Sequence, residues 1–207
     1  MPLDSTTNEE VPVHLVDLDP HSGEYNRVLD LFHKTMVKGK NYNCIVKIQR
    51  IQRPLLYSQY MEKKKDMKTS TLGRPKERWL FHGTSANVVE SINHHSFDRG
   101  YAGTAVGAIY GRGCYFARDA SYSVAYADPD PQGNCFMYVI QVLTGEFTQG
   151  SSDLLATPAI DPQKTHIVYD SVVDNPTDPT IFVVFNDTQA YPEYLIVFKK
   201  WNFLALK

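Results

Sequence analysis

Two short segments constrain the fold of this chain more than any other feature. In the first, residues 79–83 read Trp-Leu-Phe-His-Gly, so an apolar run is stopped by His82 and Gly83. In the second, residues 111–117 read Gly-Arg-Gly-Cys-Tyr-Phe-Ala, an apolar stretch flanked by glycines. A short apolar run bounded by turn residues is typical of a buried strand. The sequence therefore predicts two buried strands that deliver His82 and Tyr115 to one region.

The start of a helix follows the second strand. Residues 121–126 read Ser-Tyr-Ser-Val-Ala-Tyr, and Ser123 and Tyr126 are three positions apart, on neighbouring faces of one turn. The residues that we expect to converge on one site are His82, Gly83, Tyr115, Ser123 and Tyr126.

Composition limits the chain to one globular domain. Its 207 residues suffice for one sizeable core and are marginal for two, with ordinary hydrophobic and charged fractions. The net charge of −2 provides no basic field that would favour non-specific nucleic-acid binding. We interpret the lysine run 63–65 as the solvated face of a helix, with phosphate contact as the alternative.

The cysteines predict a reducing compartment. Cys44, Cys114 and Cys135 are odd in number and form no Cys-x-x-Cys pair, which favours the cytoplasm or the nucleus and excludes a cysteine-based zinc site. No apolar run approaches the roughly 18 residues of a membrane span and no signal peptide opens the chain, so no membrane association is expected.

Apolar periodicity predicts an α+β fold that is helical at its start and rich in strands afterwards. Ser22 caps a first helix, a strand follows at 44–51, and Pro54 begins a second helix. Later strands are expected at 79–81, 114–117, 135–143, 166–169, 180–185 and 194–198, with short helices near 86–93 and 121–127. Residues 97–109, rich in glycine and alanine, are a candidate mobile loop beside the site. The acidic start reads as a linker end over 1–10, followed by one domain over 11–200 and a tail over 201–207.

At these residues the chain resembles the catalytic domain of the poly(ADP-ribose) polymerase-like ADP-ribosyltransferases, which use NAD. It is most similar to the mono-ADP-ribosylating members that carry macrodomains or zinc fingers elsewhere in a longer chain. The motifs at 80–83, 111–117, 119–123 (Asp-Ala-Ser-Tyr-Ser), 142–145 (Val-Leu-Thr-Gly), 169–172 (Tyr-Asp-Ser-Val) and 181–198 carry the resemblance. It implies a helical N-terminal segment followed by two packed, mostly antiparallel sheets, with NAD in the cleft between them.

The resemblance also assigns roles to the site residues. It implies that the backbone of Gly83 and the hydroxyl of Ser123 hold the carboxamide of nicotinamide; a glycine leaves room for this close approach. His82 would bind a hydroxyl of the adenosine ribose, as an anchor and not as a base. The structural alternatives are a tight turn at Gly83 and a satisfied buried histidine at His82.

Aromatic walls are implied on both sides of the nicotinamide ring. Tyr115 and Tyr126 resemble the two tyrosines that sandwich the nicotinamide ring in this family. Aromatic rings suit this task because they stack well on a flat, positively charged heterocycle. The alternative is that both are core aromatics in a chain with 13 tyrosines. By the same resemblance, Arg99 contacts the adenosine side and Tyr101 lies in the loop that covers NAD. Their alternatives are a solvated arginine and an aromatic that packs on the domain.

The chain departs from the polymerizing members at Ile181. There they carry a glutamate that binds the nicotinamide ribose and activates the acceptor hydroxyl, and an isoleucine cannot polarise either group. The nearest acids along the sequence, Asp178 and Asp187, lie outside the strand. With His82, Tyr115 and Ile181 at the reacting centre, we expect one ADP-ribose to be transferred from NAD, nicotinamide to be released, and chain elongation to be lost.

The expected partners are protein substrates, the chain itself among them, with glutamate or aspartate as acceptor. We expect no metal and a monomer. Two other functions stay open: a module that binds NAD or ADP-ribose without turnover, and transfer to the end of a nucleic acid, which the negative net charge does not favour.

Overall fold

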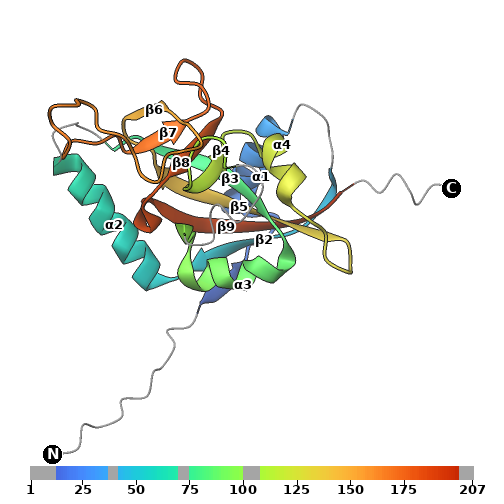
Figure 1. Ribbon diagram of the computed structural model, residues 1–207. Helices are drawn as coiled ribbons and strands as arrows, with labels where there is room; N and C mark the ends of the chain where they lie inside the picture. The colour runs from blue at the N-terminus through green and yellow to red at the C-terminus, as the bar shows by residue number, and fades with distance from the viewer. Residues whose placement is uncertain (1–12, 37–41, 70–74, 100–107, 201–207) are drawn as a thin grey trace, which may run out of the picture.

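In the computed structural model, which describes residues 13–36, 42–69, 75–99 and 108–200, nine strands form one connected sheet (Figure 1). Their order across the sheet is β1-β2-β9-β5-β3-β4-β8-β7-β6. The strands are β1 (His14–Asp17), β2 (Tyr42–Gln52), β3 (Glu77–Thr84), β4 (Cys114–Ala117), β5 (Asn134–Leu143), β6 (Phe147–Gln149), β7 (Ser171–Val173), β8 (Ile181–Val184) and β9 (Ala190–Lys200). The helices are α1 (Gly23–Thr35), α2 (Pro54–Thr69), α3 (Ala86–His95) and α4 (Ala120–Ser123), with short 3₁₀ turns η2 (Val124–Tyr126) and η3 (Asp187–Gln189). These elements lie inside the predicted domain 11–200, whose exact boundaries stay predictions.

Two halves of the sheet meet where β3 lies beside β4. β3 pairs with β5 along its whole length, and β4 does the same with β8. Between β3 and β4, the described residues pair only at Phe81 with Ala117. Neighbouring strands run antiparallel throughout this sheet except β6 and β7, which are parallel. The mostly antiparallel character is as predicted. The prediction of two packed sheets is wrong, because the pairing of Phe81 with Ala117 joins both halves into one sheet. We call the junction between β3 and β4 the seam.

The sequence predicted a chain that is helical at its start, but the N-terminal part contains strands as well as helices. β1 and β2 alternate with α1 and α2, and β2 pairs with the C-terminal strand β9, so this part forms one edge of the sheet. The expected helix signals are confirmed. Ser22 Oγ accepts the N–H of Tyr25 at 3.1 Å, and α2 begins at Pro54.

One predicted strand is absent, and three short strands were not predicted. Residues 166–169 form no strand, and Val168 makes only an isolated bridge with Ala159. β1, β6 and β7, which have four, three and three residues, were not predicted. A run of three or four residues is too short to show a period, and pairing with distant strands decides its conformation.

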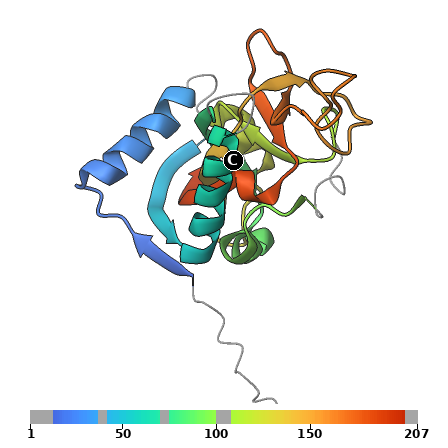
Figure 2. The same cartoon turned by 90° about the vertical axis from the view of Figure 1, so that its left-hand side faces the viewer.

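Strand alternation sends neighbouring side chains to opposite faces of the sheet. Leu80 packs in a cluster with Ile92 of α3, whereas Phe81 packs in another with Phe32 of α1 and Ala120 of α4. α1 and α4 therefore cover one face and α3 covers the other (Figures 1 and 2). The seam thus lies between helices from different parts of the sequence.

In the described part of the chain, no helix is both long and apolar enough to cross a membrane. Within the same residues, no group of three or more histidine, cysteine or acidic side chains could hold a metal ion. Cys44, Cys114 and Cys135 are free.

A buried hydroxyl connects α3 to the sheet and provides a test of the fold. Tyr138 of β5 is fully buried, and its hydroxyl donates to the carbonyl oxygen of Val89 (2.9 Å) and to Asn93 Oδ1 (2.8 Å). Tyr138→Phe removes the donor from both of these acceptors and should lower the free energy of unfolding in urea by about 1–3 kcal/mol. Tyr57→Phe, at an exposed position of α2, is the control and should change it by less than about 0.5 kcal/mol. Equal stability of the two variants would contradict the buried contact.

Candidate active site

The site is built on the seam, where backbone pairing between β3 and β4 stops at Phe81. One residue further along β3, His82 Nδ1 lies 2.9 Å from the carbonyl oxygen of Tyr115 in β4. Because a carbonyl oxygen only accepts, Nδ1 carries the proton and Nε2 of the neutral ring is left as an acceptor. Burial lowers the pKa of His82, and the hydrogen bond to Tyr115 only partly opposes this effect. His82 is therefore a neutral side chain whose Nε2 can accept a hydrogen bond from a hydroxyl.

Aromatic side chains fix the His82 ring. The Phe97 ring stands at 69° to it with centroids 5.0 Å apart, and the Phe116 ring lies 5.9 Å away. Phe97 is buried and follows Ser96, whose φ of 63° is unusual for a residue other than glycine. Sequence reasoning missed Phe97, because only its place in the fold shows that it contacts His82.

Gly83 lies against the backbone of α4. A Cβ atom at this position would lie 1.9 Å from the carbonyl oxygen of Ser123 and 3.2 Å from the backbone nitrogen of Ala127. Only glycine allows this approach, and it brings Gly83 and Ser123 together as predicted. Ser123 is buried, and its side chain makes no capping hydrogen bond at the start of η2. Gly83 and Ser123 are thus in backbone contact, at the position that follows His82 in β3.

Tyr115 is held at its hydroxyl. The hydroxyl accepts the N–H of Tyr110 at 2.9 Å and donates to the carbonyl oxygen of Gly111 at 2.8 Å. Burial raises the pKa of the Tyr115 phenol, and the nearby phenols of Tyr110 and Tyr126 raise it further, against the two hydrogen bonds. Tyr126, at the end of η2, is therefore within electrostatic range of Tyr115.

Tyr126 is the exposed member of this group. Its side chain is 54% exposed, and its hydroxyl lies 3.2 Å from the hydroxyl of Tyr122, one helical turn earlier. The two rings contact each other with centroids 5.6 Å apart. A ring that is about half exposed can stack on a flat ligand.

Ile181, the first residue of β8, pairs with Ala117 at the end of β4. It is 3% exposed and belongs to an apolar cluster against which Tyr115 packs. The position at which the resemblance implies a glutamate in the polymerizing members is thus occupied by a hydrocarbon side chain that contacts other apolar groups.

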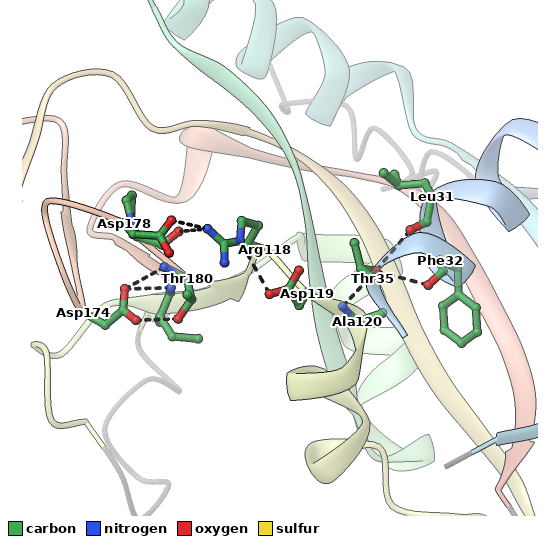
Figure 3. Close-up of polar contacts among 11 residues, drawn as sticks. Leu31, Phe32, Thr35, Arg118, Asp119, Ala120, Asp174, Asp178 and Thr180 are labelled. Carbon is green, nitrogen blue, oxygen red and sulfur yellow. Dashed lines mark hydrogen bonds and ion pairs between the residues drawn. The ribbon is translucent and has the colours of Figure 1, made fainter. Parts of the chain in front are cut away.

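An acid that the sequence analysis did not name lies beside Ile181. Asp174 Oδ1 accepts the backbone N–H groups of Thr180 and Ile181, each at 2.9 Å, and Oδ2 accepts the Thr180 hydroxyl (Figure 3). Burial acts to raise the pKa of Asp174, but these hydrogen bonds outweigh it and lower the pKa. Asp174 is seven residues from Ile181, so its closeness follows from the turn between β7 and β8 and not from a motif. Its oxygens are used to hold that turn.

Arg99 contacts the protein itself. Its guanidinium donates to the carbonyl oxygen of Phe185 at 3.2 Å, and its backbone N–H donates to Asp187 Oδ1 at the same distance. These contacts connect Arg99, which follows α3, to residues 185–187, which follow β8. Tyr101, the other residue expected on the adenosine side, lies outside the described residues.

Comparison with known proteins gives a consistent result. Residues 22–176 match the poly(ADP-ribose) polymerase catalytic domain. The chain is 43% identical over 188 residues to the human protein mono-ADP-ribosyltransferase PARP14. The matched region is 90% of this chain and 10% of that protein. It is 40% identical to mouse PARP11 (92% of this chain, 62% of that protein) and 41% identical to mouse PARP12 (87% and 25%), which bear the same description. The chain thus spans less than two thirds of the length of each of these relatives.

The contact between Gly83 and α4 predicts that no side chain is tolerated on this glycine. Gly83→Ala places a methyl group on backbone atoms that cannot move aside, so it should destabilise the domain by about 1–3 kcal/mol and abolish detectable binding of benzamide by calorimetry. Gly23→Ala is the matched control, since a Cβ there meets only the flexible end of Arg27, at 3.6 Å. Normal benzamide binding by a folded Gly83→Ala variant would contradict the placement of the site.

The lowered pKa of His82 predicts the sign of a pH dependence. Because the folded-state pKa lies below the ordinary value of 6.5, the contribution of the neutral ring to stability is complete above about pH 6.5 and is lost as the pH falls through the folded-state value. The difference in unfolding free energy between wild type and His82→Gln, measured in urea, should therefore shrink between pH 7 and pH 5. His95→Gln, at an exposed position of α3, is the control variant. A difference that grew on acidification would show that the pKa is raised instead.

Proposed function

The chain belongs to the poly(ADP-ribose) polymerase catalytic-domain family, and we propose that it transfers one ADP-ribose from NAD to a protein side chain and releases nicotinamide. The observation that carries this proposal is the backbone contact between Gly83 and Ser123 at the seam. The carbonyl oxygen of Tyr115 accepts from His82 across the seam, and the phenol of Tyr126 is near enough to raise the pKa of Tyr115. A carboxamide needs one donor and one acceptor in a fixed arrangement, and a flat ring needs an aromatic surface.

In this proposal each residue has a separate task. The Gly83 backbone and the Ser123 hydroxyl bind the carboxamide of NAD, and Tyr115 and Tyr126 stack on the ring. The Nε2 atom of neutral His82 accepts a hydrogen bond from a hydroxyl of the adenosine ribose. The bond between the nicotinamide nitrogen and the anomeric carbon breaks, its electron pair leaves with nicotinamide, and an oxygen of the acceptor forms the new bond to that carbon.

Ile181 limits the reaction to one transfer. Elongation requires the hydroxyl of an attached ADP-ribose to attack a second NAD, and a hydroxyl is a poor nucleophile at neutral pH without a base. Ile181 provides no base, and the carboxylate of Asp174 already accepts three hydrogen bonds from Thr180 and Ile181. These contacts support a mono-transferring enzyme.

The acceptor supplies what the chain lacks. With no carboxylate free beside the anomeric carbon, a glutamate or aspartate of the target protein is the group that stabilises the positive centre and then attacks it. We accordingly propose acidic side chains of proteins as acceptors, this chain's own among them. Arg99 would serve the adenosine side by fixing the backbone there, and Tyr101 remains a proposed cover of the NAD. We also propose that the protein is a monomer. We propose the cytoplasm or the nucleus as its location, because free cysteines at positions 44, 114 and 135 fit a reducing compartment.

Incubation with NAD followed by mass spectrometry of intact protein and acceptor tests this function. We expect nicotinamide in solution and one ADP-ribose per acceptor site, for wild type and for Ile181→Glu alike, because an isolated carboxylate does not rebuild the site of an elongating chain. Tyr115→Ala is the control and should lower turnover by about one to two decades, since a lost stacking contact raises the barrier by about 1–3 kcal/mol.

The other candidate functions give different outcomes in the same experiment. Binding of NAD without release of nicotinamide would indicate a binding module, and label on added RNA instead of protein would indicate transfer to nucleic acid. Lengthening chains of ADP-ribose on wild type would contradict the role given to Ile181.

A further inference from the structure

The first turn of α4 is capped by a different helix. The residue before α4, Asp119, makes no capping hydrogen bond with its side chain, and its Oδ2 lies 3.5 Å from Nε of Arg118 instead. The backbone N–H of Ala120 donates to Oγ1 of Thr35 at 3.1 Å (Figure 3). Thr35 is the last residue of α1 and lies 85 positions earlier in the chain.

The Thr35 hydroxyl is oriented for this task. As a donor it lies 3.1 Å from the carbonyl oxygen of Leu31 and 3.2 Å from that of Phe32, in the last turn of α1. Its lone pair is thereby left to accept from Ala120, which is fully buried. Without Thr35 the N–H of Ala120 would be a buried donor with no partner, which is unfavourable.

α4 lies between this contact and the proposed nicotinamide site. At its start, Ala120 packs with Phe32 of α1, and at its end the carbonyl oxygen of Ser123 lies against Gly83 of β3. The helix has four residues, so a shift at Ala120 is carried directly to Ser123 and to Tyr126 just after it. Its own side chains do not hold its first turn.

We propose that Thr35 is a positioning residue for the nicotinamide site. By accepting the N–H of Ala120, it sets the place of α4 and thus of the Ser123 hydroxyl and the Tyr126 ring. This inference rests on the proposed function for the identity of the ligand, while the contact itself can be tested without any ligand.

Three variants of the whole domain separate positioning from a loss of stability. Thr35→Val keeps the shape and removes the hydroxyl, and Thr35→Ser keeps the hydroxyl. Ser22→Ala removes the cap at the other end of α1, where Ser22 accepts the N–H of Tyr25, and so weakens the same helix far from α4. Dissociation constants for nicotinamide and benzamide are measured by calorimetry, and exchange of the Ala120 amide hydrogen by NMR, with β5 amides as the internal reference.

We expect Thr35→Val to raise both dissociation constants about fivefold to tenfold and to speed exchange at Ala120 relative to β5. Thr35→Ser should stay within about twofold of wild type, and Ser22→Ala should lower stability without changing either readout. Wild-type affinity in Thr35→Val, or an equal loss in Ser22→Ala, would overturn the positioning role. Failure of the wild type to bind either compound would overturn the proposed function, and exchange at Ala120 would then decide the Thr35 contact by itself.

Discussion

Among the residues that the structure describes, one backbone pair, Phe81 with Ala117, joins the two halves of the sheet, and the arrangement of the site depends on where that pairing stops. Had the ladder continued, β4 would cover the edge of β3 next to Gly83 and leave no polar edge for a ligand. In its place, the side chain of His82 bonds to the carbonyl oxygen of Tyr115 across the seam. This bond satisfies a backbone group that the ladder would otherwise pair and also sets the protonation of the imidazole. One interaction therefore serves both the structure and the chemistry.

The remaining site residues are fixed by contacts with backbone groups. Gly83 lies against the carbonyl oxygen of Ser123, and the hydroxyl of Tyr115 is held by Tyr110 and Gly111. Such contacts hold a site in place before a ligand arrives, because the backbone groups that make them are themselves fixed by the fold. The exposed ring of Tyr126 is the part with most freedom to adjust.

The sequence was most informative where function depends on local motifs. His82 and Gly83 at the end of β3, Tyr115 in β4 and Ser123 in α4 lie together as expected, since each ends or follows a strand whose apolar run is readable. It was least informative where distant segments meet. The contacts of Phe97 with His82 and of Thr35 with Ala120 carry no sequence signal of their own. The closeness of Asp174 to Ile181 likewise has no motif, because it depends on the path of one turn. The number of sheets was mistaken for the same reason, since a single pair decides it.

The most direct test of this account is a crystal structure of the domain with benzamide, which carries the same carboxamide as nicotinamide on a flat ring. The account predicts that the carboxamide is bound by the backbone of Gly83 and the hydroxyl of Ser123, with the ring between Tyr115 and Tyr126. Benzamide bound away from the seam, or at the seam with its carboxamide turned toward solvent, would contradict it.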